Sequence, residues 1–582
     1  MNGQPKPFFY FAVLVVILGL LGYAFYRVQG NSDVPPVSVN APAGQNSDNA
    51  PEPTQPADAG AAEAPDSNGV TTVKEYNYVP AARLPEVKGV SNYAALEDRT
   101  VKMALNVWAG WAPIVYANGG AQPGKLWKTP SGEPFKVELV LLDDPVAMRD
   151  AFAAGEVHTG WATVDMLPIL VQGLRKDSRV MPRVFQQIDW SNGGDGIVVR
   201  DTIKTASDLR GKEVVLAQNS PSQFFLLNTL INSGVDPSEV NMRFTSSAFE
   251  AAASFKAEKR IAGVVSWAPD IYNLSELKGN RMLVTTQTAN KLISDIWFAR
   301  ADFAKDHPEI IEGLVRGIFD GMMELQATDK KQAVASMMAD FYGIPPADAL
   351  SMLGDAHSTN VAENREFFLN QNNPTNFERT YNTAYMLYRK INTVDSNKTP
   401  FDKIVDFSVL QKLLKEERYQ NQTSSYGVNF VPLSASAVQS ESSEILTKTV
   451  VIQFFPNSFD LARKVEREID GKVVSEPYDP KVPFVVEEVG RLAGQYGAAR
   501  IVVEGHTDAS MRGQVPDSDV QTLSLNRANA VKQAIVSKFP TLQANQFSVV
   551  GAGWSRPADA QDPENAAKNR RVEIKVYPLE SQ

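Results

Sequence analysis

The chain has 582 residues, a length that predicts about three or four domains. Its 57 basic and 67 acidic residues give a net charge of −10, which argues against a general nucleic-acid binder because such proteins need a basic face. The absence of cysteine excludes disulfides, thiolate metal sites and a cysteine nucleophile, and the four histidines argue against a multi-histidine metal centre. We therefore expect no metal and no cofactor.

Residues 1–27 are predicted to form an N-terminal membrane anchor. The segment 8–26 reads FFYFAVLVVILGLLGYAFY and contains no charged residue. As a helix it would span about 28 Å, close to the thickness of a bilayer's hydrocarbon core. The alternative is a cleaved signal peptide, whose apolar part is normally shorter and followed by small residues, whereas this run ends in Phe25, Tyr26 and Arg27. We therefore favour an uncleaved, single-pass anchor.

Residues 28–98 are predicted to be a flexible, acidic linker rich in proline and alanine. Between residues 28 and 73 the chain has seven prolines, six acidic residues and no lysine or arginine. Such a segment cannot bury enough apolar surface to offset the entropy lost on folding. It is therefore expected to tether the folded regions that follow it.

Residues 99–420 are predicted to form an α/β region. Strand-like segments alternate with helical ones, which predicts parallel sheets covered by helices. Helices are expected at 145–155 and 222–234, and the chain becomes mostly helical after residue 300. The strands are expected at 101–107, 136–142, 196–200, 212–217, 261–267 and 281–286.

A series of phrases in this region resembles one family of binding proteins. The phrases are NVWAGWAP (106–113), DWSNGGDGIVV (189–199), KTASDLRGKEVVLAQNSPSQFFL (204–226), SGVDPSEV (233–240), VVSWAPD (264–270) and ARADFAKDHPEIIEGLVRGIFDGM (299–322). Together they resemble the periplasmic substrate-binding proteins of the sulfonate, nitrate, taurine and thiamine-pyrimidine transport group. The resemblance implies a two-lobed type II periplasmic-binding-protein fold that closes on a small ligand.

Ligands of open α/β sheets bind at the carboxyl ends of strands, so ligand-binding side chains are expected there. The tryptophans and aspartates found there favour an amine or guanidinium, whereas serines at a helix start favour an anion. Each tryptophan could instead belong to the core, and the serines could be ordinary helix caps. We favour an amine-bearing or zwitterionic ligand. The predicted ligand-binding residues are Trp108, Trp111, Asp165, Asp195, Asn219, Ser220, Ser222, Trp267 and Asp270.

Residues 421–445 are polar and serine-rich and are predicted to be a second linker. Residues 446–582 follow with a β-α-β-α-β pattern. The expected strands are 449–455, 499–508, 546–553 and 570–577, and the expected helices are 482–497 and 523–539.

The motifs VEGHTD, LSLNRANAV, GAGWSRP and NRRVEI in this last region resemble the OmpA-like peptidoglycan-binding domain. The resemblance implies that Asp508, in a loop, pairs with the ammonium of diaminopimelate in the stem peptide. It implies that Arg527, at the start of the next helix, pairs with the carboxylate. Thr507, Asn569 and Arg570 match further positions near that pocket. Outside the assigned site, Arg571 is expected to be structural and His506 to be packed rather than catalytic, and the loop 511–522 could alter access to Asp508.

These features predict an inner-membrane-anchored periplasmic protein that acts as a sensor or receptor. The alternative is a structural tether between membrane and wall whose binding fold has lost its ligand. An enzyme is disfavoured because the sequence contains no nucleophile–base motif, metal spacing or phosphate-binding loop. The expected partners are peptidoglycan with its diaminopimelate stem peptide, the inner membrane, an unknown small molecule and a membrane protein, with no nucleic acid.

Overall fold

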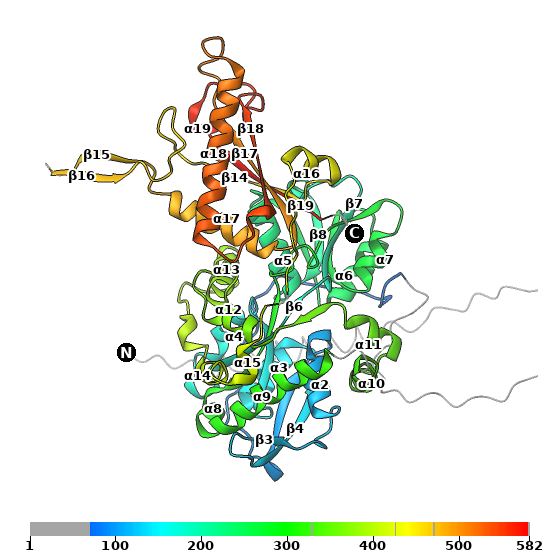
Figure 1. Cartoon of the computed structure of the whole chain (residues 1–582). Coiled ribbons are helices and arrows are strands. Elements are labelled where there is room, and N and C mark those ends of the chain that lie inside the picture. Colours follow the sequence, from blue (N-terminus) through cyan, green and yellow to red (C-terminus); the bar gives the residue numbers. More distant parts are fainter. Residues whose placement is uncertain (1–69, 327–329, 425, 470–471, 580–582) are drawn as a thin grey trace, which may run out of the picture. The chain divides into compact units, whose positions relative to one another are not determined.

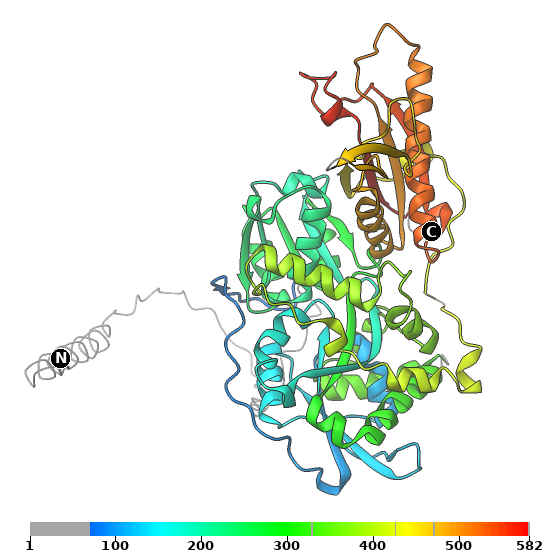
Figure 2. The same ribbon diagram turned by 90° about the vertical axis from the view of Figure 1, so that its left-hand side faces the viewer.

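The computed structural model describes residues 70–326, 330–424, 426–469 and 472–579 (Figures 1 and 2). The predicted membrane anchor at 8–26 lies outside the described residues. Among the residues that are described, no helix is long and apolar enough to cross a membrane.

The first of two large sheets has seven strands in the order β13-β6-β12-β5-β2-β4-β3. β2 runs parallel to β4 and β5, whereas β12 runs antiparallel to both of its neighbours, β5 and β6. The bounds are Thr100–Leu105 (β2), Trp127–Lys128 (β3), Pro134–Leu141 (β4), Thr159–Thr163 (β5), Pro182–Ser191 (β6), Ser294–Arg300 (β12) and Ala356–Ser358 (β13).

The second large sheet has six strands in the order β1-β9-β8-β10-β7-β11. β8 runs parallel to β9 and β10, and β7 runs antiparallel to β10 and β11. The bounds are Tyr78–Val79 (β1), Asp195–Arg200 (β7), Glu213–Ala217 (β8), Asn241–Thr245 (β9), Gly263–Trp267 (β10) and Asn280–Thr285 (β11).

Helices cover both sheets and bury an apolar face against them. In α9 the side chains of Ile310, Leu314 and Ile318, spaced by four residues, are all buried. Burying one such side chain stabilises the fold by about 1.5–3 kcal/mol. The bounds are Ala112–Asn118 (α2), Pro145–Ala154 (α3), Leu167–Leu174 (α4), Pro221–Asn232 (α5), Ala248–Ala257 (α6), Asp270–Ser275 (α7), Ala301–Asp306 (α8), Pro308–Leu325 (α9), Lys331–Tyr342 (α10), Pro346–Met352 (α11), Val361–Phe368 (α12), Phe377–Lys390 (α13), Ser408–Leu413 (α14) and Glu417–Gln420 (α15).

All six strands predicted between residues 101 and 286 are present, and the two predicted helices correspond to α3 and α5. The expectation of parallel sheets was wrong, because both sheets are mixed. The antiparallel pairs arise where β6, β7, β11 and β12 carry the chain between the sheets. The chain passes from the first sheet to the second between β6 and β7, and it returns between β11 and β12.

Residues 70–99 pack against both large sheets and their helices, and we call this segment the strap (blue in Figure 2). β1 of the strap pairs with β9 of the second sheet. Further along, the backbone N–H of Ser91 donates to the carbonyl of Ala153 at 3.1 Å, beside the first sheet. Residues 70–98 therefore belong to the folded region, which corrects the flexible linker that composition predicted for them.

The C-terminal region contains a four-stranded sheet in the order β14-β19-β17-β18. It has the predicted β-α-β-α-β order, with a two-stranded hairpin, β15–β16, that was not predicted. A short helix, α16 (Ala435–Glu441), packs through Val438 against this region, so part of the predicted linker 421–445 is folded. The other bounds are Leu446–Val450 (β14), Lys464–Ile469 (β15), Lys472–Pro477 (β16), Val482–Gln495 (α17), Ala499–His506 (β17), Asp517–Lys538 (α18), Phe547–Gly553 (β18), Ala566–Asn569 (α19) and Val572–Pro578 (β19).

Candidate functional sites

Four aspartates lie where the chain crosses between the two large sheets, and we call Asp165, Asp189, Asp195 and Asp295 the carboxyl cluster. Asp189 in β6 and Asp295 in β12 are paired on neighbouring strands, so their side chains lie on one face of the sheet. Asp165 follows β5, and Asp195 opens β7 in the other sheet. All four residues are buried, with exposed fractions from 0% to 5%.

Hydrogen bonds fix part of the cluster in place. The indole N–H of Trp108 donates to Oδ2 of Asp189 at 2.9 Å. The hydroxyl of Ser191 donates to Oδ2 of Asp195 at 2.7 Å and lies 2.8 Å from the hydroxyl of Thr286. Because Ser191 ends β6 and Thr286 follows β11, these contacts join the two crossings.

Burial raises the pKa of both Asp165 and Asp195 to about 7, because a low-dielectric environment disfavours the charged form. Neighbouring carboxylates also raise these pKa values: Asp195 raises the pKa of Asp165, and Asp189 raises the pKa of Asp195. Burial also raises the pKa values of the facing pair Asp189 and Asp295. Within the described part of the chain, no lysine or arginine forms an ion pair with any of the four. The cluster therefore lacks a compensating cation.

Several buried atoms in and beside the cluster have no hydrogen-bond partner among the described residues. They are both carboxylate oxygens of Asp165, Oδ1 of Asp189, the hydroxyl of Ser222 and the indole nitrogen of Trp267. A buried polar group without a partner costs about 1–3 kcal/mol, so it is commonly explained by a ligand, an ion or a water molecule. Three of these five atoms are carboxylate oxygens, which accept hydrogen bonds.

The structure brings Trp108, Asp165, Asp195 and Trp267 of the predicted ligand-binding residues together. Trp267 in β10 is the direct strand partner of Asp195 in β7. Trp111, in contrast, is fully buried in the hydrophobic core, and its indole N–H donates to Asn106 at 2.7 Å. Trp111 is therefore a core residue, which corrects its assignment to the ligand site.

The remaining predicted residues contact other parts of the fold. Asp270 accepts hydrogen bonds from the backbone N–H and the hydroxyl of Thr72, so it holds the strap. Asn219 donates to a backbone carbonyl of the strap at 3.2 Å. Ser220 donates to a carbonyl in the preceding turn and does not cap α5. Asp270 and Asn219 thus contact the strap, and their assignment to a ligand remains a prediction. Ser222 lies buried at the start of α5 with its hydroxyl unpartnered, as does Oδ2 of Asp270.

Sequence reasoning missed Asp189, Ser191, Thr286 and Asp295. Asp189 and Asp295 each have large apolar neighbours in their strands, Ile188 and Trp190 beside Asp189 and Ile296 and Trp297 after Asp295. A single acidic residue in such a segment is a usable signal, because a buried charge needs a reason to be there. Ser191 and Thr286 carry no such signal.

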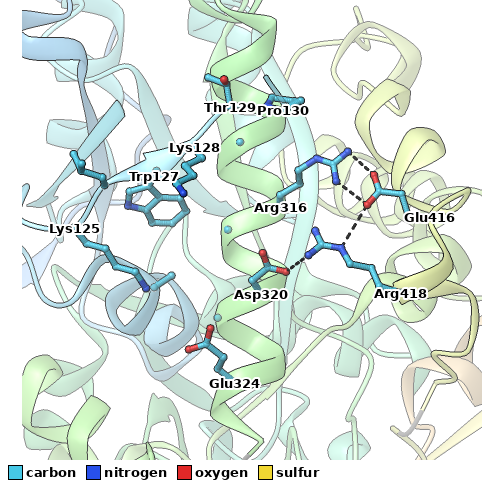
Figure 3. Close-up of a pocket in the computed structure, with 15 residues that line it drawn as sticks. Lys125, Trp127, Lys128, Thr129, Pro130, Arg316, Asp320, Glu324, Glu416 and Arg418 are labelled. Atoms are coloured by element: carbon cyan, nitrogen blue, oxygen red, sulfur yellow. Dashed lines mark hydrogen bonds and ion pairs between the residues drawn. The ribbon is translucent and has the colours of Figure 1, made fainter. Parts of the chain in front are cut away.

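A separate pocket of about 580 Å³ lies beside α9 (Figure 3). Its arginines are paired within the pocket wall, Arg316 with Glu416 at 2.7 Å and Arg418 with Asp320 at 3.0 Å. None of the predicted ligand-binding residues lines it. Because its arginines already have partners, we assign this pocket no ligand.

In the C-terminal region the structure brings Asp508, Arg527 and Arg570 close together. Arg570 Nε donates to Oδ2 of Asp508 at 2.5 Å, and the backbone N–H of Ser510 donates to Oδ1 at 3.0 Å. Burial alone would raise the pKa of Asp508, but the hydrogen bonds from Ser510 and Arg570 outweigh it and lower the pKa. Asp508 is therefore held as a carboxylate.

Arg527 has hydrogen-bonding capacity to spare. Its Nε donates to the backbone carbonyl of Ser458 at 3.1 Å, and its guanidinium lies 4.8 Å from the ring centroid of Phe454. Among the described residues no carboxylate forms an ion pair with Arg527. Burial, followed by the charge of Arg570, lowers its pKa to about 10, so it remains a cation at neutral pH. The helix α18 begins at Asp517, so Arg527 lies inside the helix rather than at its start.

Thr507 and Asn569 were also predicted for this site, whereas Arg571 was predicted to be structural. Thr507 is buried with an unpartnered hydroxyl. Arg571 donates from Nε to Glu573 at 2.8 Å and from Nη2 to the carbonyl of Arg556, in agreement with its expected structural role. Asn569 is fully buried and bonds to the loop before it.

Replacing Asn569 with alanine is expected to destabilise the C-terminal region by about 1–3 kcal/mol. Its side chain accepts from the N–H of Ala558 at 2.8 Å and donates to the carbonyls of Asp562 and Asn565 at 2.9 and 3.1 Å. Urea unfolding of the full-length protein measures the loss. Unchanged stability with lost peptidoglycan binding would instead place Asn569 at the ligand.

Glu504, His506 and Glu573 offer ligand atoms that lie within 4.8 Å of one another. Glu504 is, however, already paired with Arg556 and Lys575, each at 2.9 Å. His506 is packed between the two carboxylates and is 1% exposed, as expected for a packed residue. We assign this group to an ion-pair network rather than to a metal.

Two family comparisons match separate regions of the chain. Residues 135–331 match the family described as NMT1/THI5 like, and residues 479–571 match the OmpA family. The first range includes the carboxyl cluster, and the second includes Asp508, Arg527 and Arg570. Both resemblances inferred from the sequence motifs are confirmed.

Individual relatives agree with this division. The chain is 24% identical to the taurine-binding periplasmic protein of Escherichia coli over 252 residues, which cover 42% of this chain and 75% of that protein. It is 29% identical to the outer membrane protein Omp38 of Acinetobacter baumannii over 163 residues, covering 27% of this chain but only 43% of Omp38. The aliphatic sulphonate binding protein SsuA of E. coli superposes with a TM-score of 0.40 at 16% identity, over 53% of this chain and 98% of that one.

Proposed function

Because the chain joins an NMT1/THI5-like region to a C-terminal OmpA-family region, we propose that it is a cell-envelope protein that binds a small solute and attaches non-covalently to peptidoglycan. The solute binds where the two large sheets meet, and the stem peptide of peptidoglycan binds at Asp508 and Arg527. The chain is not an enzyme in this proposal. It is a sensor or receptor component, with a membrane protein as its signalling partner.

The observation that carries the proposal is the arrangement of Asp508, Arg527 and Arg570. A free amino-acid end presents an ammonium and a carboxylate together, and the site offers one buried carboxylate and two guanidiniums to receive them. Arg527, which has no carboxylate partner among the described residues, supplies the planar donor fork for the ligand carboxylate.

Co-sedimentation of the purified full-length protein with diaminopimelate-type sacculi tests the proposal. We expect the protein to pellet with the sacculi and to be displaced by free meso-diaminopimelate. Sacculi with lysine in place of diaminopimelate are the matched control, since they lack the second carboxylate. Equal binding to both kinds of sacculi would contradict the assigned site.

We also propose that residues 8–26 anchor the protein in the inner membrane, with everything after residue 30 in the periplasm. The support is the uncharged apolar run in the sequence and the wall-binding assignment of the C-terminal region. A reporter that is active only after export, fused after residue 70, is expected to be active. An inactive fusion that is nevertheless made in full would contradict both the topology and the wall attachment.

A structural tether remains the second candidate, in which the solute-binding fold only spaces the membrane from the wall. The uncompensated carboxyl cluster argues against it. A fold retained only as a spacer would gain stability by replacing these aspartates with apolar residues.

A further inference from the structure

We infer that the carboxyl cluster is the ligand site and that it takes a small organic cation bearing primary amine or guanidinium groups. This inference rests on the proposed solute-binding function and specifies its ligand class. Three lines of structure support it: the position of the cluster, its unsatisfied acceptors and its charge.

The cluster is placed where a ligand can be enclosed by both halves of the fold. Asp189 and Asp295 belong to the first large sheet and Asp165 follows its strand β5, whereas Asp195 and its strand partner Trp267 belong to the second. The aspartates flank both crossings of the chain between the sheets. Because all four are buried, a ligand reaches them only when the two halves separate about these crossings.

The unsatisfied atoms of the cluster call for hydrogen-bond donors. Asp165 is 1% exposed, and neither of its oxygens has a hydrogen-bond partner of good geometry among the described residues, although the hydroxyl of Thr163 interacts with the carboxyl and lowers its pKa. Oδ1 of Asp189 likewise has no hydrogen-bond partner among the described residues. An ammonium offers three donors and a guanidinium five, and neither carries an acceptor, so both fit this set.

The charged groups facing the cluster are predominantly acidic. The negative charge of Asp355, which precedes β13, raises the pKa of Asp195 further. His357 of β13 lowers the pKa of Asp189. The ring of His357 is, however, hydrogen-bonded to Glu363 at 3.0 Å. The tyrosines at the cluster are Tyr388 of α13 and Tyr426, which are neutral at physiological pH because burial raises their pKa values.

An anion would meet repulsion at the start of α5. The hydroxyl of Tyr388 donates to the carbonyl of Ser220 at 3.4 Å, at the start of α5. The negative charge of Asp165 raises the pKa of the same tyrosine. An anion placed at this helix start would therefore face Asp165. Trp108 and Trp267 add aromatic rings next to Asp189 and Asp195, and aromatic rings favour cations over anions.

Isothermal titration calorimetry of the full-length protein tests the inference with defined probes. The cations are 1,4-diaminobutane, 4-guanidinobutylamine and L-arginine, and the contrasting probes are taurine and methanesulfonate. We expect at least one cation to bind, about tenfold or more tightly at pH 8 than at pH 5.5, with release of protons, because the cation favours ionised carboxylates. Repeating the titration in two buffers of different ionisation enthalpy counts the protons.

The variants Asp165→Asn and Asp195→Asn keep the shape of the side chain and remove its charge. Each is expected to weaken cation binding about thirtyfold or more. Asp479→Asn is the matched control, because Asp479 is a buried aspartate of the C-terminal region whose carboxylate accepts from Gln453 and Lys481. It is expected to leave cation binding unchanged.

Three results would overturn the inference. The first is binding of taurine or methanesulfonate without binding of any cation, which leaves the proposed solute-binding function in place. The second is cation binding that survives in both cluster variants. The third is the absence of binding by every cation, for which sacculus co-sedimentation of the same preparation reports whether the wall-attachment part of the proposal still holds.

Discussion

Replacing Asp508 or Arg527 with alanine is expected to weaken strongly the binding of the full-length protein to diaminopimelate-type peptidoglycan. Each side chain is assigned to one end of the same zwitterion. Removing either leaves a desolvated ligand charge without its partner, which costs about 2–5 kcal/mol. This corresponds to a loss of affinity of about thirtyfold to several thousandfold.

Arg527→Lys is expected to weaken binding as well, because a single ammonium cannot reproduce the planar fork of a guanidinium. This variant is also the safer test of folding, since Arg527 is 4% exposed and its Nε bonds to Ser458. Asp559→Asn is the matched control, because Asp559 pairs with Lys568 on an exposed part of the same region. Sacculus co-sedimentation measures binding, and circular dichroism checks the fold. Wild-type binding by folded Asp508→Ala and Arg527→Lys proteins would refute the assignment.

Replacing Asp165 with asparagine is expected to stabilise the ligand-free protein at pH 8. Asp165 has a folded pKa of about 7 against an ordinary value of 3.8. The free energy of unfolding does not suffer from such a carboxyl group below its ordinary pKa, where it is protonated in both states. As the pH rises through the folded pKa, the group becomes charged inside the fold and the free energy of unfolding falls. At pH 8 the wild-type protein therefore holds a buried charge that asparagine removes, with a gain on the order of 2–4 kcal/mol.

The same reasoning fixes the pH dependence. The gain from Asp165→Asn should shrink as the pH falls from 8 to 5, because Asp165 then becomes protonated in the folded wild-type protein. Asp177→Asn should have the opposite sign at pH 8, since hydrogen bonds from Arg179 lower the pKa of Asp177 to about 2. Differential scanning calorimetry of both variants at pH 5 and pH 8 measures these changes. A destabilised Asp165→Asn protein at pH 8 would show that the ionised carboxylate is satisfied in the fold.

The alternating pattern of strands and helices was enough to predict the α/β character of the central region. It could not reveal that the sheets are mixed, because strand direction depends on which distant segments pair. The β6 and β12 strands were missed because both are buried and carry polar residues such as Gln187 and Asp295, so neither is uniformly apolar nor clearly alternating.

The sites were predicted unevenly for a similar reason. Trp108 and Trp111 lie three residues apart in one phrase, yet a short 3₁₀ turn at Ala109–Trp111 sends one ring to Asp189 and the other into the core. Composition and spacing cannot distinguish these outcomes. Arg527 was found through its motif, but the polar start of α18 hid the first turns of the helix. Local chemistry was therefore easier to predict than local geometry.

The strap gives the two halves of the central region a third covalent connection, beside the two crossings. It is held at one end by Thr72 on Asp270 and by β1 on β9, and at the other by Ser91 on Ala153. When the halves move apart, at least one of these contacts has to loosen, so the separation of the halves and the release of the strap are thermodynamically linked. By reciprocity, a solute bound between the halves, as proposed above, would change how firmly the strap is held, and loosening the strap would change the affinity for that solute by the same factor.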